Sequence, residues 1–425
     1  MTGVDPVVSD RTMVPERKPS TKPRTRRGFL RAAGGTLAAG AVTGTAGCLS
    51  SLPPLGREQS YGRLEVPPPD DPAYRRWLPG PSTFTDSSDY TFAYREPTTV
   101  DGGEPEEFLG RRAISRSELD YFGIGEANYD CLLGTPFGVV IEADVDGSSV
   151  LETLTGSGYE PDGSYRGYDL FSRSDVPRRA AVRDGVLVWS SERVHDRPDV
   201  EALIDAGAGE RQRYHEENDA FARVSEAAGA NRMLVVGPDF GDPTDTAEMG
   251  ADAFRFDGEV AYQVITLRFP EDRIPTVDRL EGAFRHEYGL TEEAKVFDVR
   301  VDGRLATLET RVPLGEPRDL SPIEDPPQVT WGADFDADSR TLTLRHEAGE
   351  PIDAWWVRYD VETEARPGGI DPVSLWTDRG RVEPGDSDTI DLSGHPDATG
   401  ASVVLARDEC CGFRVLFDYE LGGSE

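Results

Sequence analysis

Four cysteines carry the most reactive side chains of this 425-residue sequence: Cys48, Cys131 and the adjacent pair Cys410 and Cys411. Cysteine thiolates bind soft metals, and two suitably placed cysteines form a disulfide. For Cys131, Cys410 and Cys411 the alternatives are a strained vicinal disulfide, a soft-metal site, a link between two chains, or inert thiols. We favour inert thiols, because neighbouring residues of a strand point to opposite faces and the pair would then be split between core and solvent.

Carboxylates and imidazoles show weaker patterns. Asp334, Asp336 and Asp338 have the spacing of a calcium loop, but Ser339 stands where that loop needs Gly and Arg345 where it needs Glu. A turn between two strands is therefore the favoured interpretation. No pair of histidines has zinc spacing, and the five are scattered over His195, His215, His286, His346 and His395. The sequence also lacks a Gly-x-Ser-x-Gly motif and a phosphate-binding loop. We expect no enzyme, no metal and no cofactor.

The first 47 residues differ from the rest in charge. They hold eight basic and three acidic residues, whereas the whole chain has 45 and 79. A basic segment followed by a weakly apolar one is typical of an export signal. The apolar run 32–47 is too short and too rich in Gly for a membrane-spanning helix. The run Thr25–Arg31, with Arg26 and Arg27, resembles the twin-arginine export motif, which implies export of a folded protein.

The signal ends at a cysteine. The segment Thr45–Cys48 resembles a lipoprotein lipobox, although Thr45 departs from the usual Leu. The resemblance implies that Cys48 becomes the lipidated first residue after residues 1–47 are removed. One acyl chain binds a membrane only marginally, so two are expected.

The remaining chain is strongly acidic. After residue 47 there are 37 basic and 76 acidic residues, a net charge of −39, and Lys295 is the only lysine in this part. The acidic residues are spread along the chain, which predicts a solvated surface screened by salt. In this the chain resembles proteins of extremely halophilic archaea; a basic partner or calcium is the alternative explanation. Without a basic stripe, nucleic acid is not expected as a partner.

Proline-rich stretches divide the chain. We predict five parts: a twin-arginine signal peptide with lipobox (1–47), a Pro-rich disordered tether (48–82), an α+β domain (83–314), a Pro-rich linker (315–328) and a β-sandwich (329–422).

The middle part combines helix and strand patterns. Helices are predicted over 148–158, 197–207, 217–229 and 276–289, and hairpins at Asp184-Gly185 and Asp302-Gly303. Two strand–helix–hairpin halves follow one another, which predicts a duplicated, ferredoxin-like α+β module. The segment 121–134 resembles part of uncharacterised surface proteins of salt-loving archaea, and that resemblance implies no activity.

The last part shows short strands at regular spacing, which predicts a β-sandwich. The segments 336–354, 382–392 and 413–421 resemble the immunoglobulin-like domain of haloarchaeal pilin-like and surface proteins. This implies a fold and an extracellular setting. One of Trp355 and Trp356 must face outward on a strand, as an edge of the core or as a contact for a carbohydrate or a partner.

Together these observations predict a lipid-anchored extracytoplasmic protein on the outer face of the cell membrane. We expect a binding or structural component of the envelope, with an envelope protein as partner. The alternatives are a solute-binding lipoprotein and an enzyme whose site is assembled from dispersed residues.

Overall fold

The structure is a computed structural model of the 425-residue chain. It describes residues 64, 66–83, 89–238, 242, 244, 246–258, 260–287, 297–364, 372–406 and 413–421. The predicted export signal Arg26 and Arg27, the lipidation site Cys48, and Cys410 and Cys411 lie outside these residues. Residues 58–425 belong to one compact unit.

No helix among the described residues combines the length and the apolar character needed to cross a membrane.

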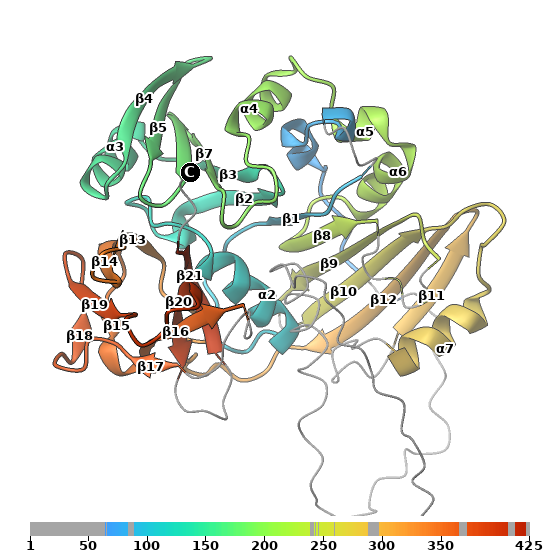
Figure 1. Ribbon diagram of the computed structural model, residues 1–425. Coiled ribbons are helices and arrows are strands. Elements are labelled where there is room, and N and C mark those ends of the chain that lie inside the picture. The colour runs from blue at the N-terminus through green and yellow to red at the C-terminus, as the bar shows by residue number, and fades with distance from the viewer. Residues whose placement is uncertain are drawn as a thin grey trace, which may run out of the picture. The chain divides into compact units, whose positions relative to one another are not determined.

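A 12-stranded antiparallel sheet dominates the unit (Figure 1). Its strands are β1 (Phe92–Arg95), β2 (Tyr129–Thr135), β3 (Gly138–Ala143), β4 (Glu160–Tyr165), β5 (Tyr168–Arg173), β6 (Arg178–Arg183), β7 (Val186–Ser191), β8 (Met233–Gly237), β9 (Met249–Asp257), β10 (Val260–Arg268), β11 (Phe297–Asp302) and β12 (Leu305–Pro313). Their order across the sheet is β11-β12-β10-β9-β8-β1-β2-β3-β7-β6-β5-β4.

This sheet shows that the predicted fold class was wrong. Instead of a ferredoxin-like α+β module in two halves, strands from both predicted halves lie in one mainly β structure. The short strand β1 makes the connection, since Ala93 pairs with Gly134 of β2 on one side and with Val235 of β8 on the other. Backbone pairing across β1 removes the two free edges that separate halves would present.

Helices cover both faces of the sheet. One face carries the 3-10 helix η2 (Ala73–Trp77) with α4 (Val200–Ala208), α5 (Tyr214–Glu217) and α6 (Asp219–Ala228). The opposite face carries α2 (Glu106–Ser117), α3 (Gly147–Gly156) and α7 (Val277–Glu287). Alternation along β10 shows this division, because Val264 packs in the core under α6 while Ile265 and Leu267 pack with α7.

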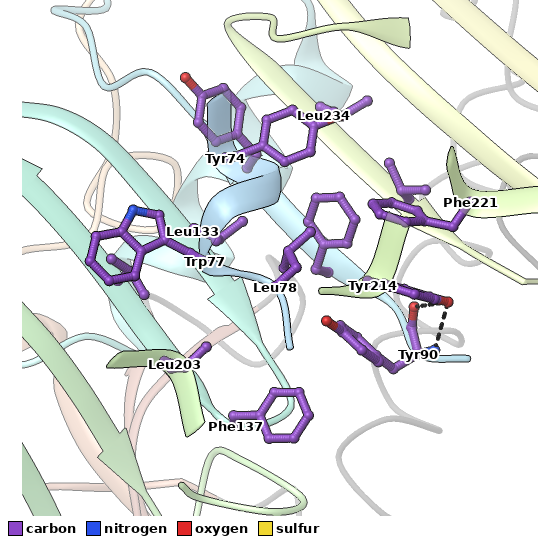
Figure 2. Close-up of a cluster of buried hydrophobic side chains, with 14 of the residues drawn as sticks. Tyr74, Trp77, Leu78, Tyr90, Leu133, Phe137, Leu203, Tyr214, Phe221 and Leu234 are labelled. Carbon is purple, nitrogen blue, oxygen red and sulfur yellow. Dashed lines mark hydrogen bonds between the residues drawn. The ribbon is translucent and has the colours of Figure 1, made fainter. Parts of the chain in front are cut away.

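Aromatic side chains fill the core beneath η2, α4, α5 and α6, as Figure 2 shows. The Tyr214 ring stacks between Tyr90 and Phe221, with centroid distances of 4.4 and 4.1 Å. Trp77, the last residue of η2, and Leu78, which follows it, are buried in the same core. The end of the segment that composition assigns to the tether thus packs against the sheet.

The C-terminal residues form three smaller sheets, ordered β13-β14-β19, β17-β16-β20-β21 and β15-β18. The strands are β13 (Val329–Asp336), β14 (Thr341–Gly349), β15 (Ile352–Asp353), β16 (Val357–Thr363), β17 (Val373–Ser374), β18 (Arg381–Val382), β19 (Ser387–Asp391), β20 (Ala398–Ala406) and β21 (Phe413–Glu420). They enclose one core around Trp331 and Trp376, and η5 (Ala354–Trp356) closes one end with Trp356.

Polar contacts connect these sheets to the large sheet and to helix α2. Arg116 of α2 contacts Glu350 at 2.7 Å, and Arg173 of β5 contacts Glu347 of β14 at 2.7 Å. The Arg178 guanidinium donates to the backbone oxygen of Trp331 at 3.1 Å. The two regions therefore pack through charged groups as well as apolar ones.

Candidate functional site

Cys131 is the one predicted thiol that the structure describes. It lies half-buried on β2, opposite Glu142 of β3. Burial, and then the nearby Glu142 carboxylate, raise the pKa of the Cys131 thiol to about 12. The group is therefore a protonated thiol at neutral pH, a poor nucleophile and a poor metal ligand. Whether Cys410 and Cys411 approach it lies outside the described residues.

Of the three aspartates in the calcium-like pattern, Asp334 and Asp336 lie near the end of β13 and Asp338 lies in the turn to β14. The Asp336 carboxylate accepts hydrogen bonds from the backbone of Asp338 (2.9 Å) and Ser339 (3.2 Å). The carboxylate thus caps its own turn. Within the described ranges, no three His, Cys, Asp or Glu side chains come together in a way that could hold a metal ion.

The described histidines and tryptophans mostly serve packing. His346 is buried beside Trp331, and its Nε2 lies 3.0 Å from the Glu350 backbone oxygen. His195 packs against the buried Trp189. Trp355 is the exception among the tryptophans, because 52% of its surface is exposed while the neighbouring Trp356 is buried.

A hollow that we call the arginine hollow lies on the sheet face that carries η2 and α4. Its volume is about 180 Å³, and five segments line it: Arg76 and Trp77 of η2, Arg166 and Tyr168 around the β4–β5 turn, Arg183 at the end of β6, Val186 at the start of β7, and Ile204, Gly207 and Ala208 of α4. A hollow of about 10 Å³ between α3 and the opposite face holds about one water molecule at most. The arginine hollow is the larger of these two.

Aromatic and aliphatic groups form the floor of the arginine hollow. Trp77, Tyr168 and Ile204 are each 5% exposed or less. The Trp77 ring lies directly on the backbone of α4, and a Cβ at Gly207 would clash with it. Glycine inside a helix costs about 0.5–1 kcal/mol relative to alanine, so contact with Trp77 accounts for a glycine at this position.

Three guanidinium groups form the rim. Arg76 and the Trp77 Nε1 both donate to the same oxygen of Glu142. Arg166 Nε donates to Asp205 Oδ1 at 2.6 Å, and its Nη1 lies 4.0 Å from Glu210. These contacts hold Arg76 and Arg166 in place, and within the described part of the chain they occupy only some of the five N–H groups of each guanidinium.

Arg183 differs from the other two arginines of the rim. Its guanidinium carbon lies 4.4 Å from the centre of the Tyr168 ring, a cation–π contact. Among the residues that the structure describes, no carboxylate forms an ion pair with it. The rim therefore carries one positive charge that no described side chain neutralises.

The backbone at Arg166 is in the left-handed region. Its φ is +48°, and Gly167 follows with φ +82°, so the two residues form the tight turn between β4 and β5. Asn, Asp and Gly are the residues that favour such turns. Arginine at this position is therefore held there against its own conformational preference.

Sequence patterns did not predict the arginine hollow. Its residues come from segments up to 132 positions apart, between Arg76 and Ala208. The sequence holds one local signal of it: Tyr-Arg-Gly-Tyr at 165–168 is a hairpin turn with an arginine at its tip. Arg76 and Trp77 could not be expected in a site either, because both lie in the segment 48–82 that was predicted to be a disordered tether.

No protein-family model matches the chain, and comparison with curated proteins finds no match. Among solved structures, those of the protein TP0453 in crystal forms I, III and IV are similar to it, with TM-scores of 0.36, 0.33 and 0.32. Sequence identity is 10%, 10% and 9%, and the matches cover 53% of this chain and 90%, 91% and 90% of the other. Similarity at these scores supports no conclusion about function.

Proposed function

We propose that the chain is a lipid-anchored extracytoplasmic surface protein that binds a small solute. The arginine hollow carries this proposal. It combines a buried aromatic floor, a charged rim and a volume of about 180 Å³. Small-molecule sites are concave, mainly apolar, and contain a few placed polar groups.

The proposed location depends on the N-terminal sequence. The run with Arg26 and Arg27 supports export, and Cys48 supports attachment to the outer face of the cell membrane. The acidic composition supports a solvated surface. An envelope protein that receives the solute is the expected partner.

Location is tested by replacing Cys48 with Ala in the producing cells and separating membranes from the soluble fractions. We expect the Cys48→Ala protein to leave the membrane fraction, because the thiol is the site of acylation. Cys131→Ala is the matched control and should stay with the membranes. Retention of Cys48→Ala in the membrane fraction would contradict lipid anchoring.

Solute binding is tested by native mass spectrometry of protein isolated from its own cells. Ala208 is exposed at the edge of the arginine hollow, so Ala208→Trp should fill the hollow while leaving the core intact. Ala227→Trp, at an exposed position of α6 that does not line the hollow, is the control. We expect a small adduct on the wild type and the control, and none on Ala208→Trp. An adduct that persists on Ala208→Trp would place binding elsewhere.

A further inference from the structure

We infer that the arginine hollow selects a small organic acid, with its anionic group at Arg183 and a short apolar body over Trp77, Tyr168 and Ile204. This inference rests on the proposed function, since it names the class of solute for the same hollow. A neutral solute and an inorganic anion are the alternatives that the experiment separates.

Charge is the first argument. The protein carries 79 acidic and 45 basic residues, yet the side chains of the rim that reach the arginine hollow are three arginines and no carboxylate. Glu142 and Asp205 are already bonded to Arg76 and Arg166. Arg183 is the cation left over, and a guanidinium binds carboxylate, phosphate or sulfate through paired N–H groups. An anion would complete the rim.

Size and lining are the second argument. A volume of about 180 Å³ lies below the range of about 300–1,000 Å³ that is typical of sites for drug-sized ligands. The floor consists of Trp77, Tyr168 and Ile204, which offer flat and apolar contact. An inorganic anion would use the rim and leave this floor in contact with water. A carboxylate on a short apolar or planar body uses both.

The backbone at Arg166 is the third argument. Asparagine would suit its positive φ better, so the turn loses stability by carrying arginine. The side chain gains an ion pair to Asp205 that points the guanidinium along the rim. The guanidinium also lies over the Tyr165 ring, with its carbon 5.5 Å from the ring centre, and together these contacts hold it at the rim, where an anion can reach it.

The test measures binding to the full chain by calorimetry and by the shift in melting temperature at constant salt. Three probes are compared: benzoate, a carboxylate on a flat apolar ring; benzyl alcohol, its neutral counterpart; and inorganic phosphate. We expect benzoate to bind saturably and raise the melting temperature, and the other two to bind at least about tenfold more weakly.

Single substitutions then test which side chains contact benzoate. Arg183→Gln should weaken benzoate binding about tenfold or more, as expected for loss of a charge-assisted hydrogen bond. Arg223→Gln, at an exposed position of α6 outside the hollow, is the matched control.

Arg166→Asn should weaken benzoate binding while leaving the melting temperature unchanged or higher. Opposite effects on binding and stability cannot arise from a misfolded variant.

Gly207→Ala tests the floor, because the added methyl group displaces Trp77. Benzoate binding should fall in this variant. Gly110→Ala is the control, since a Cβ at Gly110 in α2 meets no atom within 4 Å.

The remaining outcomes overturn the inference in distinguishable ways. Equal binding of benzyl alcohol and benzoate would reject an anionic ligand but keep solute binding. Equal binding of phosphate and benzoate would reject the organic body. If no probe binds and the small adduct is also absent from wild-type protein, both the inference and the proposed function fail.

Discussion

At the scale of single residues, one buried carboxylate is the shared ion-pair partner of three arginines. Glu126, in the 3-10 helix η4 (Glu126–Asn128), is 3% exposed and contacts Arg95, Arg112 and Arg116. Burial by itself raises the pKa of Glu126, but attraction by the three arginines outweighs it and holds the pKa below its usual value. Arg112 and Arg116 also reach Asp325 and Glu350, so this one carboxylate supports the contact between the large sheet and the C-terminal region.

We therefore expect Glu126→Gln to destabilise the protein by about 3–5 kcal/mol, because three buried arginines lose their shared partner. The free energy of unfolding from denaturant titration measures this. Glu226→Gln, at an exposed position, is the control and should stay within about 0.5 kcal/mol of wild type. An equal effect in both variants would show that Glu126 has no special role.

The pH dependence of the same residue has a definite sign. A lowered folded-state pKa gives stability that is present above the unfolded-state pKa, about 4.3 for Glu, and is lost as pH falls through the folded-state value. Glu126→Gln lacks this contribution at every pH. The gap between the melting temperatures of wild type and Glu126→Gln should therefore shrink as the solution is acidified below about pH 4. A gap that stays constant would mean that Glu126 is not ionised at neutral pH.

At the scale of elements, local signals located four of the α-helices and missed α2 and α5. The helices α3, α4, α6 and α7 begin and end within three residues of their predicted ranges. Asp146, Asp199 and Asn218 cap the first three, and such caps are visible in sequence. In contrast β1, β4 and β9 were not predicted: β1 has four residues and pairs with the distant strand β8, and β4 contains Pro161 and Gly163. The candidate site likewise depends on contacts between segments that are far apart in the sequence, η2 and α4 with the strands β4 to β7.

The cap of α4 offers a prediction at this scale. The Asp199 side chain accepts a hydrogen bond from the Ala202 backbone at 2.8 Å. Asp199→Ala should destabilise the protein by about 1 kcal/mol, and Asp199→Asn should restore most of the loss because Asn is an equally good cap. Denaturant unfolding of the two variants measures the difference. Equal losses in Ala and Asn variants would point to the charge of Asp199 instead of its hydrogen bond.

At the scale of the whole molecule, the large net charge opposes the compact state. A net charge of −34 in 425 residues favours expansion of the chain through self-repulsion. Salt shortens the Debye length from about 8 Å at 0.15 M to about 3 Å at 1 M. We expect the melting temperature to rise with potassium chloride and to level off when exposed charges are screened. A melting temperature independent of salt would show that the surface charges are already balanced locally.

The packing of η2 has a geometric consequence for a lipid-anchored chain. Asp70, just before η2, is already bridged to Ala230, and only 22 residues separate it from Cys48. Even a fully extended backbone spans no more than about 3.6 Å per residue, so the tether from Cys48 to Asp70 is at most about 80 Å long. A tether this short keeps the protein in a thin layer above the bilayer, so it meets membrane proteins there instead of in bulk solution. A membrane protein that accepts the solute would then meet a loaded hollow at a raised effective concentration, without any strong contact between the two proteins.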